Sequence, residues 1–261
     1  MYILIPVAAF GTIGLVMGLV LAAASKVFSV EKDDRIDKVL ERLPGANCGG
    51  CGYAGCSACA EAIVKGEAEI NACPGNSQEN VSLIAKIMGV REKTTEPKAA
   101  FVKCCGEYKN VNYGYFFDGT KNCSDVFKMR GGDKECVYSC LGYGDCLNAC
   151  KFGAISLKDG IAAVNREKCV GCGMCRDVCP KQVIDILPKK AKVYVKCSSK
   201  EKGVFVKNKC SVGCIGCGLC SKNCPLDAIN VIDNLAVIDY DKCRGCGLCA
   251  EKCPKKIIIK V

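Results

Sequence analysis

The chain has 261 residues, of which 26 are cysteine and none is histidine, and its formal net charge is +10. Without histidine, most zinc-finger and haem ligand sets are excluded, so any metal site must be built from cysteine or nearly so. A secreted disulfide scaffold is disfavoured, because the thiols of C-x2-C-x2-C runs are too crowded to pair with each other. The cysteine content therefore indicates metal centres in a reducing compartment.

The positive charge alone would suit a nucleic acid or an anionic membrane surface. However, a [4Fe-4S]2+ core with four thiolates carries about −2, so five such clusters would contribute about −10. The chain also lacks tryptophan and any run of alternating basic and aromatic residues, which leaves nucleic-acid binding without support. We interpret the lysines as compensation for buried cluster charge and expect no nucleic-acid partner.

Residues 1–25 contain no charged side chain, and the first cation is Lys26. About 20 apolar residues are enough for a helix to span a bilayer, whereas a cleaved signal peptide would need a basic segment before a shorter apolar core. Cations follow the apolar run at Lys26, Lys32, Arg35 and Lys38, which favours a cytoplasmic location for that side. The sequence predicts a single-pass anchor in the cell membrane, with the remaining chain on the cytoplasmic side.

Residues 26–90 are predicted to form an N-terminal helical 4Fe-4S domain. Apolar residues at helical spacing predict a helix over residues 33–43, and further helices are expected over residues 58–65 and 80–90. A C-x2-C-x4-C-x16-C pattern within this domain supplies four thiolates, and its glycines let the backbone wrap closely around a cofactor. The four cysteines are Cys48, Cys51, Cys56 and Cys73.

One cysteine of this domain, Cys59, is surplus to the pattern and is expected to be a small buried residue. The glycines around Cys51 also match G-x-G-x-x-G, but no strand precedes them and cysteines interrupt them, so a dinucleotide site is not expected. Residues 91–100 (REKTTEPKAA) are charged, contain proline and lack periodicity, which predicts a linker.

The rest of the chain is an internal repeat of two ferredoxin-like units, residues 101–190 and 191–261. Each is expected to be a two-cluster ferredoxin of bacterial type, in which a short β-hairpin separates two cysteine runs. The first hairpin is predicted over residues 154–164 and the second over residues 228–238. Eight cysteines recur at a constant offset: Cys136, Cys140, Cys146, Cys150, Cys169, Cys172, Cys175 and Cys179, then Cys210, Cys214, Cys220, Cys224, Cys243, Cys246, Cys249 and Cys253. The overall fold class is thus a series of small α+β iron–sulfur modules.

Ligation in such units is crossed, because the cysteine of each C-P pair serves the other cluster. Five [4Fe-4S] clusters are predicted, one in the N-terminal domain and two in each unit. The sets in the two units are Cys136, Cys140, Cys146 with Cys179; Cys169, Cys172, Cys175 with Cys150; Cys214, Cys217, Cys220 with Cys253; and Cys243, Cys246, Cys249 with Cys224.

The two copies differ at one position. Where the second unit has Cys217, the first has Tyr143, so the third close ligand there is expected to be Cys136. The counterpart of Cys136 is Cys210, which is an alternative to Cys217 as a ligand. Four further cysteines could be structural or could hold another metal centre: Cys104, Cys105, Cys123 and Cys197, of which the last two share the offset of the repeat.

The order of an N-terminal anchor, a C-x2-C-x4-C-x16-C module and tandem ferredoxin units resembles the B subunit of Rnf electron-transport complexes, in the long form. The resemblance covers nearly the whole chain. It implies an iron–sulfur relay subunit of a membrane complex that oxidises reduced ferredoxin, reduces NAD+ and couples this to Na+ or H+ transport. The implied partners are the other subunits, soluble ferredoxin and the membrane. The chain alone would be an electron-transfer protein with no catalytic acid, base or nucleophile.

Two other hypotheses remain. A polyferredoxin subunit of a membrane hydrogenase or heterodisulfide reductase would share the tandem units but not the N-terminal cysteine module. A cysteine-only zinc scaffold would normally use spaced C-x2-C pairs and not triplets followed by C-P. A brown colour with a broad visible shoulder would distinguish iron–sulfur clusters from colourless zinc.

Overall fold

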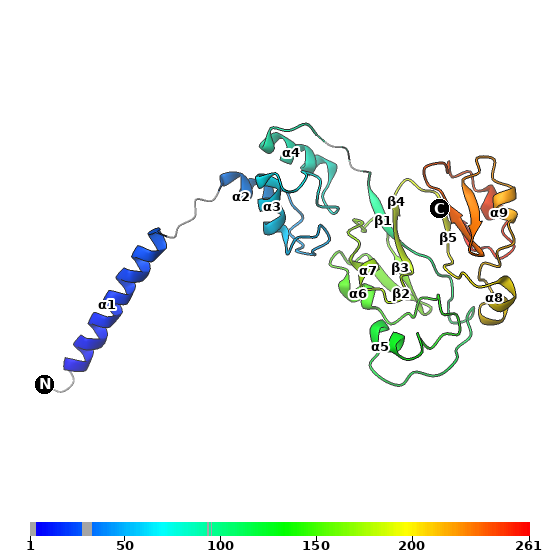
Figure 1. Cartoon of the computed structure of the whole chain (residues 1–261), viewed down its shortest axis with the longest axis horizontal. Helices are drawn as coiled ribbons and strands as arrows, with labels where there is room; N and C mark the ends of the chain where they lie inside the picture. Colours follow the sequence, from blue (N-terminus) through cyan, green and yellow to red (C-terminus); the bar gives the residue numbers. More distant parts are fainter. Residues whose placement is uncertain (1–3, 28–32, 93, 95) are drawn as a thin grey trace.

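A computed structural model describes residues 4–27, 33–92, 94 and 96–261 of the protein. The described residues form, in chain order, a separate helix, a small helical domain and two units of short strands and helices (Figure 1). This arrangement confirms the prediction of small α+β modules.

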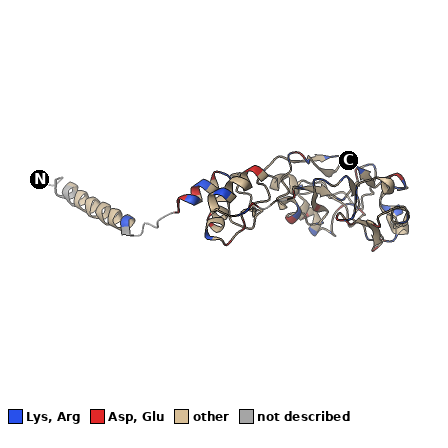
Figure 2. Ribbon diagram, turned by 90° about the horizontal axis from the view of Figure 1, so that it is seen from above, with Lys and Arg blue, Asp and Glu red and all other residues tan. Residues whose placement is uncertain are grey.

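The N-terminal helix α1 spans Leu4–Val27 and has one basic residue in its last turn, Lys26. Figure 2 shows it free of acidic side chains. Large apolar side chains such as Phe10 and Leu21 are exposed along it. No helix in the described part of the chain has the length and apolar character that a membrane span requires. The predicted anchor is therefore not confirmed, and its first three residues, like Lys32 beyond it, lie outside the described residues.

Three helices build the N-terminal domain: α2 (Asp34–Leu40), α3 (Cys56–Lys65) and α4 (Gln78–Met88). The carboxylate of Asp33 accepts a hydrogen bond from the backbone N–H of Arg35 and caps α2, while α4 ends at a left-handed glycine, Gly89. The three helices bury their apolar faces against one another in a common core. All three predicted helices are thus present.

Each ferredoxin-like unit contains the predicted hairpin. Strand β2 (Ile155–Lys158) pairs with β3 (Ile161–Val164), and β6 (Ile229–Ile232) pairs with β7 (Leu235–Ile238), both antiparallel. The turn residues Asp159-Gly160 and Asp233-Asn234 all have positive φ. Two consecutive left-handed residues make the type I′ turn that suits the twist of a hairpin.

Each unit also contains a second sheet that the sequence did not reveal. Strand β1 (Lys98–Val102) pairs with β4 (Ile184–Pro188), and β5 (Val193–Val195) pairs with β8 (Ile258–Lys260), again antiparallel. The first strand of each pair opens its unit and the second closes it, so the two ends of the unit are joined. Strand β1 begins inside the segment predicted as a linker, and the first unit therefore includes residues 98–100.

Short helices carry a buried cysteine at a fixed place. Each of four helices begins directly after a glycine in the left-handed conformation and has its cysteine at the second position, where it is buried. These helices are α6 (Asp145–Ala149), α7 (Met174–Asp177), α9 (Leu219–Lys222) and α10 (Leu248–Glu251). Two other helices, α5 (Cys123–Lys128) and α8 (Gly203–Lys209), have no glycine of this kind before them. The repeated glycine–helix arrangement aims the third thiol of each run inward.

Candidate iron–sulfur sites

All 26 cysteines lie in the described part of the chain, and every one is a free thiol. Within the described residues, no group of three or more His, Cys, Asp or Glu side chains is arranged to hold a single metal ion. Four thiolates around one zinc ion would each lie about 2.3 Å from it and would nearly touch one another. Sets of four cysteines line three separate hollows, an arrangement that suits clusters of several irons.

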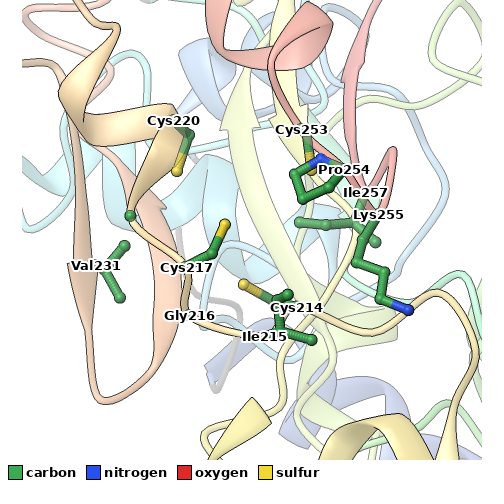
Figure 3. Close-up of a pocket in the computed structure, with 11 residues that line it drawn as sticks. Cys214, Ile215, Gly216, Cys217, Cys220, Val231, Cys253, Pro254, Lys255 and Ile257 are labelled. Atoms are coloured by element: carbon green, nitrogen blue, oxygen red, sulfur yellow. The ribbon is translucent and has the colours of Figure 1, made fainter.

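The first site of the second unit contains three cysteines of one run and one from the other run (Figure 3). Cys214 and Cys217 lie on the loop before α9, Cys220 lies on α9, and Cys253 precedes Pro254. The hollow between them, counted together with the space at its mouth that is open to solvent, has a volume of about 320 Å³, and Figure 3 shows the four sulfurs directed toward it. Cys210 is absent from this lining, so the geometry favours Cys217 over Cys210 at this site.

The same crossed arrangement recurs at the second site of each unit. Hollows of about 320 Å³ and 370 Å³ are lined by four cysteines each: Cys150, Cys169, Cys172 and Cys175 in the first unit, and Cys224, Cys243, Cys246 and Cys249 in the second. The backbone N–H of Ala154 donates to the sulfur of Cys150 at 3.4 Å, and that of Ala228 donates to Cys224 at 3.3 Å. Such N–H···S bonds stabilise a charged thiolate and help to set a cluster's potential.

Burial shapes the acid–base behaviour of these thiols. Removal from solvent, with a smaller contribution from neighbouring thiols, raises the pKa of Cys175 to about 12 and that of Cys249 to about 11. Without iron these groups keep their protons at neutral pH. Iron binding must therefore displace protons, as is usual when metal ligands are thiols.

The first site of the first unit is irregular, because Tyr143 stands where the second unit has Cys217. The hydroxyl of Tyr143 donates a hydrogen bond of 2.6 Å to the carboxylate of Asp133, which fixes the tyrosine side chain. The sulfur of Cys123 lies beside the backbone of residues 143–145. Burial raises the pKa of the Cys123 thiol, whereas hydrogen bonds from the backbone N–H groups of these residues to its sulfur lower it. A thiol from elsewhere in the chain thus reaches the place of the missing one.

Asp145, the first residue of α6, holds Cys123 there. Its carboxylate accepts hydrogen bonds from the backbone N–H of Cys123 at 2.8 Å and from that of Ser124 at 3.0 Å. Burial is the main cause that raises the pKa of Cys146 to about 12, and the nearby thiols Cys140, Cys123, Cys179 and Cys175 contribute to the rise. Cys175 lines the second hollow of this unit, which leaves Cys123, Cys140 and Cys179 as the thiols near Cys146.

The spacing predicts that Cys136 completes that group, but the structure places it at another hollow. Its pKa is raised to about 11 by burial, and the cysteines that add to this shift are Cys104 and Cys210. Cys136 lines the hollow that also contains Cys104, Cys105, Cys197 and Cys210. The sequence spacing favours Cys136 because it precedes Cys140 closely, whereas Cys123 is brought in by a loop with no counterpart in the second unit.

The N-terminal site brings together its four predicted cysteines. Burial is the main cause that raises the pKa of Cys73 to about 11; a hydrogen bond from the backbone N–H of Gly75 opposes the rise, and the nearby thiols Cys51, Cys48 and Cys56 contribute to it. The side-chain oxygen of Asn47 accepts a hydrogen bond of 2.8 Å from the backbone N–H of Cys56 and so fixes the start of α3. The fifth cysteine, Cys59, is 1 % exposed and belongs to the helical core, as expected for a small buried residue.

The N-terminal site lies against the first unit. A Cβ atom added at Gly50 would lie 2.7 Å from the carbonyl oxygen of Cys172 and 2.9 Å from its Cβ. Cys48 is also near enough to affect the pKa of Cys172, which burial raises. The N-terminal cluster loop and the cluster loop of the first unit are thus in direct contact, and only glycine fits between them.

Lysines beside the sites were not singled out from the sequence. The ammonium group of Lys134 is buried and donates to the carbonyl oxygens of Gly106, Cys140 and Gly160 at 2.8–3.0 Å. Burial lowers its pKa, whereas the surrounding cysteines favour its charge. Because lysine is common in this chain, nothing in the sequence distinguished Lys134 from the exposed lysines. In the structure it places a positive charge beside two groups of thiols.

Comparison with known protein families agrees with this geometry. A family model described as a putative Fe-S cluster matches residues 43–74. A model described as a 4Fe-4S dicluster domain matches residues 168–228 and 213–257. These matches leave out residues 75–167, where the irregular run and its partner Cys123 lie.

Proteins with similar sequences extend over most of the chain. The chain is 44% identical over 242 residues to the B subunit of the Na(+)-translocating ferredoxin:NAD(+) oxidoreductase complex of Acetobacterium woodii, with 92% of this chain and 73% of that protein covered. It is 43% identical to the B subunit of the ion-translocating oxidoreductase complex of Methanosarcina acetivorans, with 91% and 90% covered. It is 41% identical to the B subunit of the proton-translocating ferredoxin:NAD(+) oxidoreductase complex of Clostridium ljungdahlii, with 88% and 82% covered.

Proposed function

Because the chain belongs to the family of B subunits of ion-translocating oxidoreductase (Rnf) complexes, we propose that it relays electrons from reduced ferredoxin to partner subunits that reduce NAD+. Transfer would be coupled to Na+ or H+ transport by those partners. The observation that carries the proposal is the grouping of thiols in fours around hollows of similar size, with the N-terminal group in contact with the first unit. Such a series suits electron transfer from one cluster to the next.

The ligand sets follow from the groups described above. Each group of four thiolates suits one [4Fe-4S] cluster, which when bound takes up and releases one electron at a time. The five sets are Cys48, Cys51, Cys56 and Cys73; Cys123, Cys140, Cys146 and Cys179; Cys150, Cys169, Cys172 and Cys175; Cys214, Cys217, Cys220 and Cys253; and Cys224, Cys243, Cys246 and Cys249.

The chain itself contributes position and electrostatics. The left-handed glycines before α6, α7, α9 and α10 direct one thiol of each set inward. Backbone N–H groups such as that of Ala100, which donates to the sulfur of Cys169 at 3.3 Å, stabilise the thiolates. Buried and half-buried lysines offset the negative charge of the filled sites.

Attachment to the membrane part of the complex is assigned to α1. Its described large apolar side chains, from Val7 to Leu21, are more than half exposed. A helix with so much exposed apolar surface is expected to be covered by lipid in the assembled complex, with the cluster-bearing domains on the cytoplasmic side.

Replacing Cys172 by serine tests the relay. We expect the variant to lose one cluster, about four irons per chain, and to slow ferredoxin-driven NAD+ reduction by the complex at least about tenfold. Cys59→Ser is the matched control, because Cys59 is a buried cysteine beside the N-terminal site that belongs to no set of four, and it should retain iron and rate. A Cys172→Ser complex that has lost iron yet works at the normal rate would contradict the serial relay.

A further inference from the structure

A further hollow lies between the two ferredoxin-like units, and its thiols belong to none of the five sets. It has an empty volume of about 340 Å³, close to that of the cluster sites. Its cysteines come from both units: Cys104, Cys105, Cys136, Cys197 and Cys210. We propose that four of them hold an additional [4Fe-4S] cluster between the units, with Cys104 and Cys136 supplied by the first unit and Cys197 and Cys210 by the second.

The two halves of this hollow are built alike. Strand β1 runs into Lys103-Cys104 and strand β5 runs into Lys196-Cys197, so one cysteine follows the opening strand of each unit. The sulfur of Cys104 accepts a hydrogen bond from the backbone N–H of Cys140 at 3.4 Å. The sulfur of Cys197 accepts one from the backbone N–H of Cys214 at 3.3 Å.

Cys140 and Cys214 are counterparts in the repeat, and Cys136 and Cys210 stand four residues before them. Each unit therefore offers the same two thiols in the same setting. Cys197 corresponds structurally to Cys104, and not to Cys123 as the offset of the repeat suggested. The segment between Cys104 and Cys136 is longer than that between Cys197 and Cys210, which explains why a fixed offset misaligned them.

Paired side chains mark the approximate twofold relation between the units. Phe101 and Tyr194 occupy equivalent places three residues before Cys104 and Cys197, and their rings stack with centroids 4.5 Å apart. Equivalent residues that contact each other lie near a twofold axis, as in the self-complementary interface of a dimer. The same axis places the four thiols around one hollow.

A second pair of equivalent contacts ties this hollow to the neighbouring sites. Lys181, next to Cys179-Pro180, donates to the carbonyl oxygen of Val137, and Lys255, next to Cys253-Pro254, donates to that of Ser211 at 2.7 Å. Val137 and Ser211 directly follow Cys136 and Cys210. Each unit thus fixes its hollow-lining cysteine by a lysine that brings positive charge toward the thiolates.

The fifth cysteine, Cys105, has a different role. Its thiol donates a hydrogen bond of 3.1 Å to the carbonyl oxygen of Lys196, and burial raises its pKa. In the second unit the equivalent residue is Ser198, whose hydroxyl likewise donates to a carbonyl oxygen, that of Tyr138. This position therefore holds a hydrogen-bond donor in both units, and Cys105 is not a ligand.

A cluster at this place would connect the units. Its thiolates Cys104 and Cys197 accept hydrogen bonds from Cys140 and Cys214, which are assigned to the nearest cluster of each unit. An electron crossing from one unit to the other would pass this site, each site being oxidised by one electron as the next is reduced by one. That relay role rests on the proposed function; the presence of the cluster does not.

The test uses the full chain, purified anaerobically and supplied with ferrous iron and sulfide. The wild type should contain about 24 irons, against about 20 for five clusters. The single variants Cys104→Ser and Cys197→Ser should each lose about four irons and the same EPR signal on dithionite reduction. Cys105→Ser is the matched control and should keep both.

The outcomes separate clearly. Loss of one shared signal from variants in either unit supports a cluster between them. Full iron content in both variants, loss of two different signals, or stoichiometric zinc that disappears in the variants would overturn it. If a variant loses all iron through misfolding, the wild-type count decides, with about 24 supporting and about 20 contradicting the proposal. Ferredoxin oxidation by the wild type tests the proposed function separately.

Discussion

At the scale of single residues, the replacement of one thiol by a tyrosine is compensated from a distance. Tyr143 directs its hydroxyl to Asp133, and Cys123 reaches the vacated position while Asp145 holds its backbone. A thiol therefore lies where the run Cys140–Cys146 lacks one. The proposed set at this site keeps four thiols although the spacing motif is broken.

Cys123→Ser should remove about four irons and one EPR signal, because a serine hydroxyl is a poor substitute for a thiolate. The double variant Cys123→Ser/Tyr143→Cys should regain both, since it restores the regular C-x2-C-x2-C run of the second unit. Iron analysis and EPR of the purified chain measure this. Full iron content in the single variant would show that Cys123 is not a ligand.

Lys134 combines a structural and an electrostatic role at one residue. Lys134→Met would leave three buried carbonyl oxygens without their hydrogen-bond donor, and it should lower the free energy of unfolding by about 3 kcal/mol. The loss of stability would be measured as a lower temperature at which the clusters are lost on heating. The substitution should also lower the reduction potential of the neighbouring clusters, because a nearby positive charge is lost. Lys128→Met is the control, since Lys128 is exposed on α5 and pairs with Asp125 at 3.0 Å. Unchanged potentials and stability would contradict both roles.

At the scale of elements, the cysteine-bearing loop of the N-terminal domain packs directly against the backbone of a cysteine-bearing loop of the first unit. The N-terminal loop meets the loop of Cys172 at Gly50, where even a methyl group would have to displace backbone atoms. Gly75 lies on the same side of the N-terminal domain, and a Cβ there would make ordinary contacts of 3.4–3.7 Å with Val170, Phe152 and Pro44. These two glycines allow the docking of the domain to be tested without touching a ligand.

Gly50→Ala should keep all its iron but slow electron transfer between the N-terminal site and the first unit, because transfer falls steeply with distance. Gly75→Ala should behave as the wild type. Rapid-freeze EPR after reduction of the complex by ferredoxin would measure the transfer. Equal rates for the two variants would show that this contact is not on the electron path.

At the scale of the whole molecule, the helix to which we assign membrane attachment is separate from the domains that contain the cysteines. Helix α1 stands apart from the cluster-bearing domains in Figure 1, and no cysteine lies in it. The remaining described domains contain their own buried cores. The two tasks should therefore be separable by truncation.

A chain that begins after residue 26 should retain its full iron content and its reduction by dithionite. It should no longer sediment with membranes together with the other subunits, because α1 carries the exposed apolar surface. The full-length variant Val16→Glu/Val20→Glu should behave in the same way and controls for the loss of length. Membrane association of the truncated chain at the normal level would contradict the role given to α1.

The sequence alone predicted the iron–sulfur character, the module order, the hairpins of both units and four of the five ligand sets that we propose. These features depend on local spacing: a thiol two or three residues from the next is held by the turn that contains both. The family resemblance was likewise carried by such spacings and by their order. It is confirmed by relatives that cover most of the chain.

Only the tertiary structure decided the places of Cys123, Cys136, Cys104, Cys197 and Cys210. These thiols reach their positions through strand pairing at the ends of each unit, through an inserted segment and through stacking of Phe101 on Tyr194. Such contacts join residues far apart in the chain, so neither motif spacing nor a constant repeat offset could reveal them. Cysteines that the sequence left without a firm assignment (Cys104, Cys105, Cys197 and Cys210) thus line one hollow together with Cys136, through the approximate twofold packing of the two units.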